Sequence, residues 1–353
     1  MKKNRLWILL VVILFSLSLA ACGTTAVEPA AEEPAAEAPA AEEPAAEAPA
    51  AEEPAAEEPA ALTYEDLVVG FAQIGAESEW RTAETNSILA VAEELGVELK
   101  FSDAQQQQEN QIAAIRSFIA QGVDVIGVAP VVESGWEPVF QEAKDAGIPI
   151  ILVDRGADVP DELYTSFIGS DFVLEGENAC EEMAGLLSEE GNIIELQGTV
   201  GAGPAIDRQA GFASCLEGYP NMSMLDSQSG NFTRAEGKEV MEAFLQTYGD
   251  QINGVYAHND DMAIGAIQAI EEYGLVPGED IKIVSVDGVK GAFEAMVDGT
   301  LNCTVECNPL LGPQFFEAAL MLANGEEVPR WIKSNEGVYC QEVAAEMLPE
   351  RQY

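Results

Sequence analysis

Residues 108–131 have the sequence QENQIAAIRSFIAQGVDVIGVAPV, which contains one helix followed directly by one strand. Apolar residues recur at helical spacing up to Gln121, and Gly122 then ends the helix. The strand that follows, at 123–130, is almost continuously apolar rather than alternating. Strands of this kind are typical of a parallel sheet that helices cover on both faces. The stretch therefore predicts an α/β fold, provided that the unit recurs along the chain.

The same unit recurs on both sides of this stretch. Helices are expected at 80–95 and 136–146, through Cys180, from Ala205, Arg234 and Asp260, after residue 288, and as a last long helix. Strands are expected at 67–74, 97–103, 148–154, 192–198, 222–228, 254–259, 281–288 and 302–307. These strands are too many for one small sheet, so we predict two doubly wound parallel-sheet domains. An eight-fold barrel is the alternative.

The N-terminus has the parts of a secretory signal. Lys2, Lys3 and Arg5 are basic, residues 7–17 are apolar, and Leu-Ala-Ala-Cys follows at 19–22. This ending resembles the lipobox of bacterial lipoproteins, which implies that residues 1–22 are a lipoprotein signal and that Cys22 is lipidated. The alternative is a plain signal peptide, and the apolar run is short for a transmembrane span. We expect an extracytoplasmic protein, in the periplasm or at the outer cell surface, anchored to the membrane by lipid.

Residues 23–61 are rich in alanine, glutamate and proline. AEEPAAEAPA occupies 31–40 and 41–50, and AEEPAAEEPA occupies 51–60. Regularly spaced proline blocks a stable helix, the glutamates repel one another, and no side chain is large enough to build a core. We predict a disordered, extended tether that holds a globular part of some 290 residues away from the membrane.

The globular part is strongly acidic. The whole chain has 62 acidic and 16 basic residues, and removal of the 11 tether glutamates and 3 signal bases leaves 51 acids against 13 bases. A surface of this charge repels phosphates, so a nucleic-acid partner is not expected. With so few bases, each arginine near a strand end is a candidate for a functional role.

Five cysteines follow Cys22, and none has the CxxC spacing of a zinc or redox site. In an oxidising compartment we expect disulfides, with one thiol left over because the number is odd. Cys180 and Cys215 fall on neighbouring expected helices and are favoured as a pair. Cys340 is expected to pair with Cys303 or Cys307, which lie four residues apart on one strand and cannot easily bridge each other.

Polar residues mark the carboxyl ends of the expected strands, where ligands bind in open parallel sheets. These residues are Gln73, Asp103, Asp154 with Arg155, Gln197, Asn259, Asp287 and Glu306, while Arg81 and Arg208 lie just after strand ends. Because they come from both halves of the chain, we predict one cleft that both halves line.

The stretch YAHNDDMA at 256–263 contains His258, the one histidine of the chain. Asp260 is expected to cap the following helix, and Asp261 is expected to place a negative charge near the positive end of that helix. Both aspartates therefore have structural roles. His258 has no histidine or cysteine near it, and no DxDxDG calcium loop is present, so we expect neither metal nor cofactor. The functional candidate is Asn259, whose amide both donates and accepts hydrogen bonds, as a sugar hydroxyl requires.

Seven motifs together resemble the type 1 periplasmic sugar-binding proteins of ABC transporters, in the ribose-binding class, and within it the galactofuranose-binding proteins. They are VGFAQIGAESEWRTA (69–83), the opening stretch at 108–131, VDR (153–155), ELQGTVGAGPAIDR (195–208), SQSGNFTRAEGKEVM (227–241), VYAHNDDMAIGAIQAI (255–270) and VDGVKGAFEAM (286–296). The similarity covers nearly all of residues 66–340.

This resemblance implies two Rossmann-like lobes joined by three hinge strands. The N-terminal lobe would comprise 62–168 and 307–333, and the C-terminal lobe 169–306 and 334–353. The implied sugar-binding residues are Trp80, Arg81, Asp154, Arg155, Arg208, Phe232, Asn259, Asp287 and Glu306. Carboxylates accept from hydroxyls, guanidinium groups donate to them, and the two aromatic rings cover the C–H face of a sugar.

The resemblance also implies the function: a monomer that binds a monosaccharide, of galactofuranose type or another hexose or pentose, and delivers it to an ABC permease. A sugar-sensing module for a chemoreceptor or sensor kinase is the alternative. A repressor core is disfavoured by the signal sequence. A remote alternative is an NAD-dependent oxidoreductase, because GTVGAG at 198–203 lies between a strand and a helix. Its glycine order is GxxGxG rather than GxGxxG, so we predict that the protein is not an enzyme.

Overall fold

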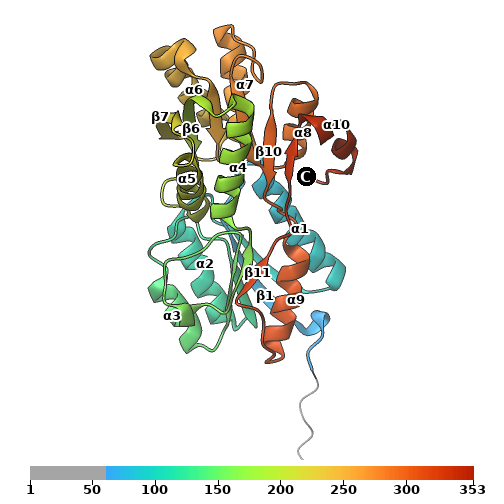
Figure 1. Ribbon diagram of the computed structural model, residues 1–353. Helices are drawn as coiled ribbons and strands as arrows, with labels where there is room; N and C mark the ends of the chain where they lie inside the picture. The colour runs from blue at the N-terminus through green and yellow to red at the C-terminus, as the bar shows by residue number, and fades with distance from the viewer. Residues whose placement is uncertain (1–60) are drawn as a thin grey trace, which may run out of the picture. The chain divides into compact units, whose positions relative to one another are not determined.

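The computed structural model describes residues 61–353 and contains two six-stranded sheets (Figure 1). The signal, Cys22 and the tether up to residue 60 lie outside the described residues. Within residues 61–353, no helix combines the length and the apolar run that crossing a membrane requires.

The first sheet is parallel throughout and has the order β11-β5-β4-β3-β1-β2. Its strands are β1 (Val68–Gln73), β2 (Glu98–Asp103), β3 (Val125–Val128), β4 (Ile150–Val153), β5 (Ser166–Gly169) and β11 (Trp331–Lys333). The helices around it are α1 (Glu79–Leu95), α2 (Gln108–Gln121), α3 (Glu137–Asp145) and α9 (Gly312–Ala323). Two separate apolar cores result, one between the sheet and helices α1 and α9, and the other between the sheet and helices α2 and α3.

The opening stretch of the sequence forms α2 and β3, as predicted. Gly122 ends α2 in the left-handed conformation, with φ 65°. Gly127 in the middle of β3 is required by packing, because a Cβ there would lie 2.5 Å from Phe315 and 2.6 Å from Phe71. Those two rings meet edge to face with centroids 5.3 Å apart, which joins α9 to the centre of the sheet.

The second sheet has the order β12-β10-β9-β8-β6-β7 and is parallel except for the antiparallel edge strand β12. Its strands are β6 (Glu190–Gln197), β7 (Asn221–Ser229), β8 (Gly254–Ala257), β9 (Lys282–Asp287), β10 (Cys303–Glu306) and β12 (Val338–Cys340). Its helices are α4 (Phe172–Leu187), α5 (Gly203–Leu216), α6 (Arg234–Tyr248), α7 (Asp260–Tyr273), α8 (Lys290–Val297) and α10 (Gln341–Met347). Within residues 61–353, short 3₁₀ turns also lie at Tyr64–Asp66, Asp161–Leu163, Gly249–Gln251 and Leu348–Glu350.

The chain passes from one sheet to the other three times. The first crossing follows β5, the second follows β10, and the third joins β11 to β12. The crossings are made by three short segments, at 170–171, 307–311 and 334–337, which agree in number with the three hinge strands that the sequence resemblance implies. The expectation of two parallel-sheet α/β domains is therefore confirmed, and the eight-fold barrel is wrong.

Two disulfides cross-link the second sheet and its helices. Cys180 is bonded to Cys215, the pair that the sequence favours, and this bond joins α4 to α5. Cys303 is bonded to Cys340, which resolves the open pairing and joins β10 to β12. Cys307 is left as a buried free thiol.

The sequence patterns miss three strands and one helix. β5 follows a polar loop and has four residues, β11 and β12 have three each, and α10 has seven. β11, β12 and α10 carry too few residues for a periodic signal, and the apolar run of β5 is limited to Phe167 and Ile168. The three strands β5, β11 and β12 are positioned by pairing with β4, β5 and β10, respectively. Such pairing is a long-range property that local sequence patterns do not contain.

Candidate functional site

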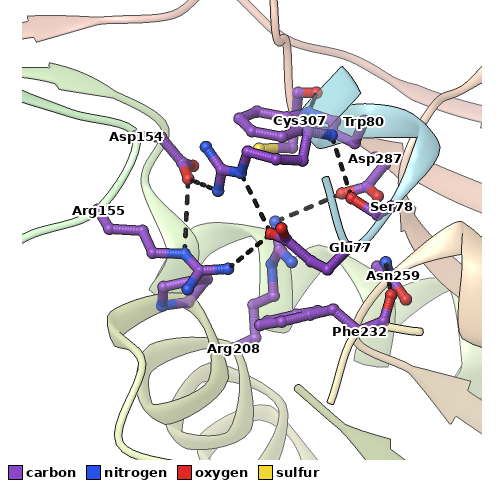
Figure 2. Close-up of a pocket in the computed structure, with 12 residues that line it drawn as sticks. Glu77, Ser78, Trp80, Asp154, Arg155, Arg208, Phe232, Asn259, Asp287 and Cys307 are labelled. Carbon is purple, nitrogen blue, oxygen red and sulfur yellow. Dashed lines mark hydrogen bonds and ion pairs between the residues drawn. The ribbon is translucent and has the colours of Figure 1, made fainter. Parts of the chain in front are cut away.

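One pocket gathers side chains from the carboxyl ends of strands in both sheets (Figure 2). Its lining residues are Glu77, Ser78, Trp80, Arg81, Asp154, Arg155, Pro204, Arg208, Phe232, Asn259, Asp287 and Cys307. The cavity between these side chains has a volume of about 20 Å³, which is room for roughly one water molecule. The side chains thus lie close together in this arrangement, and a larger ligand requires them to move apart.

Arg81 is the most connected residue on the first-sheet side of the pocket. It lies in the first turn of α1, where Ser78 caps the helix by accepting a hydrogen bond from the Arg81 N–H at 3.0 Å. Its guanidinium group donates to Glu77 at 3.2 Å and to Glu84 at 2.8 Å, and it also donates to Asp154. Because three carboxylates surround it, the pKa of Arg81 is raised well above its ordinary value despite burial, so it stays charged.

Arg155 lies opposite and shares acidic partners with Arg81. Its Nη2 is 3.5 Å from Glu77 Oε1, its Nε is 3.6 Å from Asp154 Oδ2, and its Nη1 donates to the carbonyl of Val131 at 3.1 Å. Burial, together with the positive charge of Arg81, lowers the pKa of Arg155 to about 10. Burial also opposes ionisation of Glu77, but the two arginines outweigh it and lower the pKa of that carboxyl.

Arg208 pairs with buried carboxylates on the second-sheet side of the pocket. From α5 it donates to Glu175 at 2.7 Å and to the carbonyl of His258 at 2.6 Å, and its Nη2 is 3.8 Å from Asp287 Oδ1. Burial raises the pKa of Asp287 well above its ordinary value, because the distant Arg208 offsets burial only in part. The 3.8 Å separation from Arg208 leaves the Asp287 carboxyl oxygens available to a ligand.

Two aromatic rings complete the pocket. Trp80 donates its indole N–H to the carbonyl of Cys307 at 2.5 Å, so the ring is held between α1 and the second crossing. The guanidinium of Arg81 lies 4.7 Å from the centre of the Trp80 ring, and that of Arg155 lies 5.2 Å from the Phe232 ring. Figure 2 shows the Phe232 ring beneath the arginine and carboxylate groups. The pocket thus combines flat apolar faces with dense hydrogen-bonding groups.

Three of the lining residues have backbone strain. Asp154, Phe232 and Asp287 have φ of 63°, 62° and 131°, in the region that favours glycine. Non-glycine residues keep such angles where their side chains have a required position, and they cluster at functional sites. The three residues come from the ends of β4, β7 and β9, so the strain falls at the strand ends that converge on the pocket.

Eight of the nine predicted sugar-binding residues line this pocket, and Glu306 does not. Glu306 accepts from Arg351 Nη1 at 2.8 Å and from the Tyr353 hydroxyl at 2.9 Å, so residues near the end of the chain occupy its carboxylate. The sequence analysis did not name Glu77, Ser78, Pro204 or Cys307 as sugar-binding residues. Glu77 and Ser78 could have been found, because they lie in the loop between a strand end and Arg81.

Asn259 lines the pocket, but both ends of its amide have protein partners. Its Oδ1 accepts from the N–H of Met262 at 3.0 Å, and its Nδ2 donates to the carbonyl of Phe232 at 3.0 Å. Asn259, not Asp260, is therefore the cap of α7, and the prediction for Asp260 is wrong. Asp260 is buried and instead accepts from Ser285 at 2.5 Å, Thr304 at 2.8 Å and the Val289 N–H at 2.8 Å.

His258 has a structural partner. Its Nε2 lies 3.0 Å from Glu195 Oε1, and its Nδ1 accepts from the Gly198 N–H at 3.4 Å. Burial lowers the pKa of His258, which keeps the ring neutral at pH 7. Burial opposes ionisation of Glu195, but hydrogen bonds from His258, Ser227 and Gln197 outweigh it and lower its pKa to about 2. The stretch YAHNDDMA thus supports the sheet and the pocket wall.

Known proteins resemble this chain over most of its length. The galactofuranose-binding protein YtfQ of Escherichia coli K12 is 49% identical over 290 residues, which are 81% of this chain and 91% of the relative. A solved periplasmic binding protein of the arabinose ABC transporter from Shewanella sp. ANA-3, bound to α- and β-L-arabinofuranose, is 50% identical with TM-score 0.79 and covers 81% of this chain and 95% of its own.

A solved structure from Mycobacterium smegmatis in complex with β-D-fucofuranose is 52% identical with TM-score 0.79, over 81% of this chain and 95% of its own. The family model of the periplasmic binding protein domain matches residues 69–327. Together, the two sheets joined by three crossings and these matches show that the chain belongs to the periplasmic binding protein family, whose members bind solutes and are not enzymes.

Proposed function

We propose that the protein captures a monosaccharide in the pocket, in its five-membered furanose form, and delivers it to an ABC permease. The observation that carries this proposal is the alternation of guanidinium and carboxylate groups around a cavity with two aromatic faces. The names of the three relatives add support, because each includes a sugar in furanose form.

The chemistry of the pocket fits a neutral polyol. Among the described residues, Glu77 Oε2 and Arg155 Nε are buried without a hydrogen-bond partner. One sugar hydroxyl can donate to the first while another accepts from the second, which would remove the cost of leaving these atoms unpaired. A charged ligand fits less well, because the three arginines already have carboxylate partners.

The pocket also requires movement for entry. Its residues enclose too little free space for a sugar ring to enter without rearrangement. We propose that residues 62–168 with 307–333, and 169–306 with 334–353, are two lobes that separate to admit the sugar and close on it. Because both sheets contribute contacts, the sugar would favour the closed form, which the permease would recognise.

We further propose that a lipid on Cys22 anchors the protein outside the cytoplasmic membrane and that residues 23–61 form its tether. Galactofuranose is the finer assignment, supported by the 49% identity to a galactofuranose-binding protein. A labelled-lipid or mass-spectrometric analysis of the mature N-terminus would test the anchor. An unmodified N-terminus downstream of residue 22 would contradict it.

The binding proposal can be tested with residues 62–353, which contain all of the described cores and both disulfides and are therefore expected to fold alone. Calorimetric titration with galactose, arabinose, fucose, ribose and xylose should give one-to-one binding of at least one sugar. Carbon-13 NMR of the anomeric carbon of the bound sugar would then identify its ring form.

Bound furanose signals support the proposal. A pyranose signal would leave sugar binding in place but overturn the ring form, and no binding by any sugar would overturn the function. The control variant is Arg116→Ala, which removes an exposed ion pair with Glu142 and should bind as the unchanged protein does.

A further inference from the structure

A buried cluster of one thiol and two carboxylates lies beside the pocket. A carboxylate oxygen of Glu175, the Cys307 sulfur and a carboxylate oxygen of Glu336 all lie within 4.8 Å of one another. Cys307 and Glu175 are 2% and 3% exposed. Two of these groups are thus buried and the third is partly exposed, and all three can become negative, which is costly unless a cation or protons neutralise them.

The cluster has an unused ligand atom. Glu175 Oε2 accepts from Arg208 at 2.7 Å, whereas Oε1 is buried without a hydrogen-bond partner among the described residues. Glu175 and Glu336 also line a second cavity of about 390 Å³, which gives a small ion a route to the cluster.

We propose that Glu175, Cys307 and Glu336 form a Zn²⁺ site at the hinge. A thiolate with two carboxylates suits zinc better than calcium or magnesium, which prefer oxygen ligands alone. Tetrahedral zinc ligands lie roughly 3.5 Å apart, so these atoms would need only a small approach. Cys307 loses its proton to solvent when the sulfur–zinc bond forms, and water would complete the coordination.

Neighbouring groups are placed to orient the ligands. The Asn308 N–H donates to Glu336 Oε1 at 2.9 Å, Ser170 donates to the same oxygen, and Arg208 holds Glu175. Such second contacts fix ligand orientation in metal sites. Two carboxylates, a thiolate, Zn²⁺ and the Arg208 guanidinium would together be electrically neutral.

The ligands come from different segments of the hinge. Glu175 is in the first turn of α4 after the first crossing, Cys307 begins the second, and Glu336 lies in the third. A metal here would connect the second and third crossings to the start of α4, which follows the first crossing directly. The sequence-based expectation of no metal rested on local spacing, which cannot detect ligands 132 and 29 residues apart.

The test uses chelator-treated residues 62–353, in which Cys307 is the one cysteine outside the two disulfides. Cobalt(II), a spectroscopic substitute for zinc, should bind one-to-one and give a near-ultraviolet thiolate-to-cobalt band that Zn²⁺ abolishes by competition. Cys307→Ser should remove the band, and Glu336→Gln should weaken cobalt binding at least 10-fold.

Glu182→Gln is the matched control, because Glu182 lies beside the sulfurs of Cys303 and Cys340, which are already bonded to each other. It should leave the band and the affinity unchanged. If no band forms, or if Glu336→Gln binds cobalt as tightly as the unchanged protein, the proposal is overturned. Glu336 is partly exposed, so this variant should fold even if Cys307→Ser does not. The readout is independent of sugar binding, so either proposal can fail alone.

Discussion

Arg208 and Glu175 form a buried ion pair, with 2.7 Å between Nε and Oε2, that joins α5 to α4. Each side chain is 4% exposed, so neither charge has water as an alternative partner. Arg208 lines the pocket, and Glu175 belongs to the cluster with Cys307 and Glu336. The pair therefore connects the groups proposed to bind sugar to the segments that join the two sheets.

Removing one member of this pair should destabilise the fold severely. Glu175→Ala leaves Arg208 buried without its main partner, which costs about 3–5 kcal/mol. Denaturant unfolding in the presence of EDTA would measure this cost. Glu142→Ala, which breaks the exposed pair with Arg116, is the control and should cost at most about 1 kcal/mol. Equal losses in the free energy of unfolding for the two variants would show that the buried pair stabilises the fold no more than the exposed pair does.

Asp287→Ala should weaken sugar binding more than it weakens the fold. The side chain makes only a long contact to Arg208, at 3.8 Å, so its carboxyl oxygens are free to bond with hydroxyls. Loss of hydrogen bonds to such a group costs about 1.5–3 kcal/mol, or roughly 10–100-fold in affinity. Calorimetry and thermal unfolding on the same variant would separate the two effects.

Arg81→Ala should lower both affinity and stability, because three carboxylates lose their shared partner. An unchanged sugar affinity in both Arg81→Ala and Asp287→Ala would refute the site.

Gly198→Ala should displace Phe232 from the pocket. A Cβ at this position would lie 1.9 Å from the tip of the Phe232 ring, and that ring is itself 4% exposed and cannot easily retreat. We expect a loss of at least 10-fold in sugar affinity, measured by calorimetry. Gly185→Ala in α4 is the matched control, because a Cβ there meets nothing within 4 Å and affinity should be retained. Wild-type affinity in Gly198→Ala would mean that Phe232 does not contact the sugar.

Asp260 should make stability decrease as pH rises from about 4 to about 7. Burial raises its pKa from 3.8 to about 7 in the folded protein. Between these values the folded state holds a proton that the unfolded state has lost, so the free energy of unfolding falls as pH rises. Denaturant unfolding at several pH values should show this slope, and Asp260→Asn should reduce it. An unchanged slope in the variant would assign the effect to other buried carboxyls.

Strand ends could be located from the sequence because parallel buried strands have continuous apolar runs that stop at polar residues. Asp154, Arg155 and Asp287 were found in this way, and each lies where the pattern predicts. Trp80 and Phe232 needed the family resemblance, because an aromatic residue in a loop has the same local signal whether it lines a pocket or fills a core.

Glu306 shows where local reasoning stops. It ends β10 as Asp287 ends β9, and the two are paired in register. Its carboxylate is nevertheless bound by Arg351, 45 residues further along the chain. The sequence analysis assigned the cap of α7 to Asp260 rather than to Asn259 for a similar reason. Both are good caps, and the choice between them depended on Ser285 and Thr304, which occupy Asp260 from neighbouring strands.

The three arginines of the pocket are among only 13 bases in the globular part, and each is at most 4% exposed. The positive charges of these three arginines are therefore buried, and an approaching solute first meets the electric field of the many exposed acidic residues. Uronic acids and sugar phosphates would be repelled before they reach the pocket, and the repulsion would weaken as salt is added. Neutral sugars would approach without hindrance, so discrimination by charge would begin in the surrounding water, ahead of any contact with the pocket.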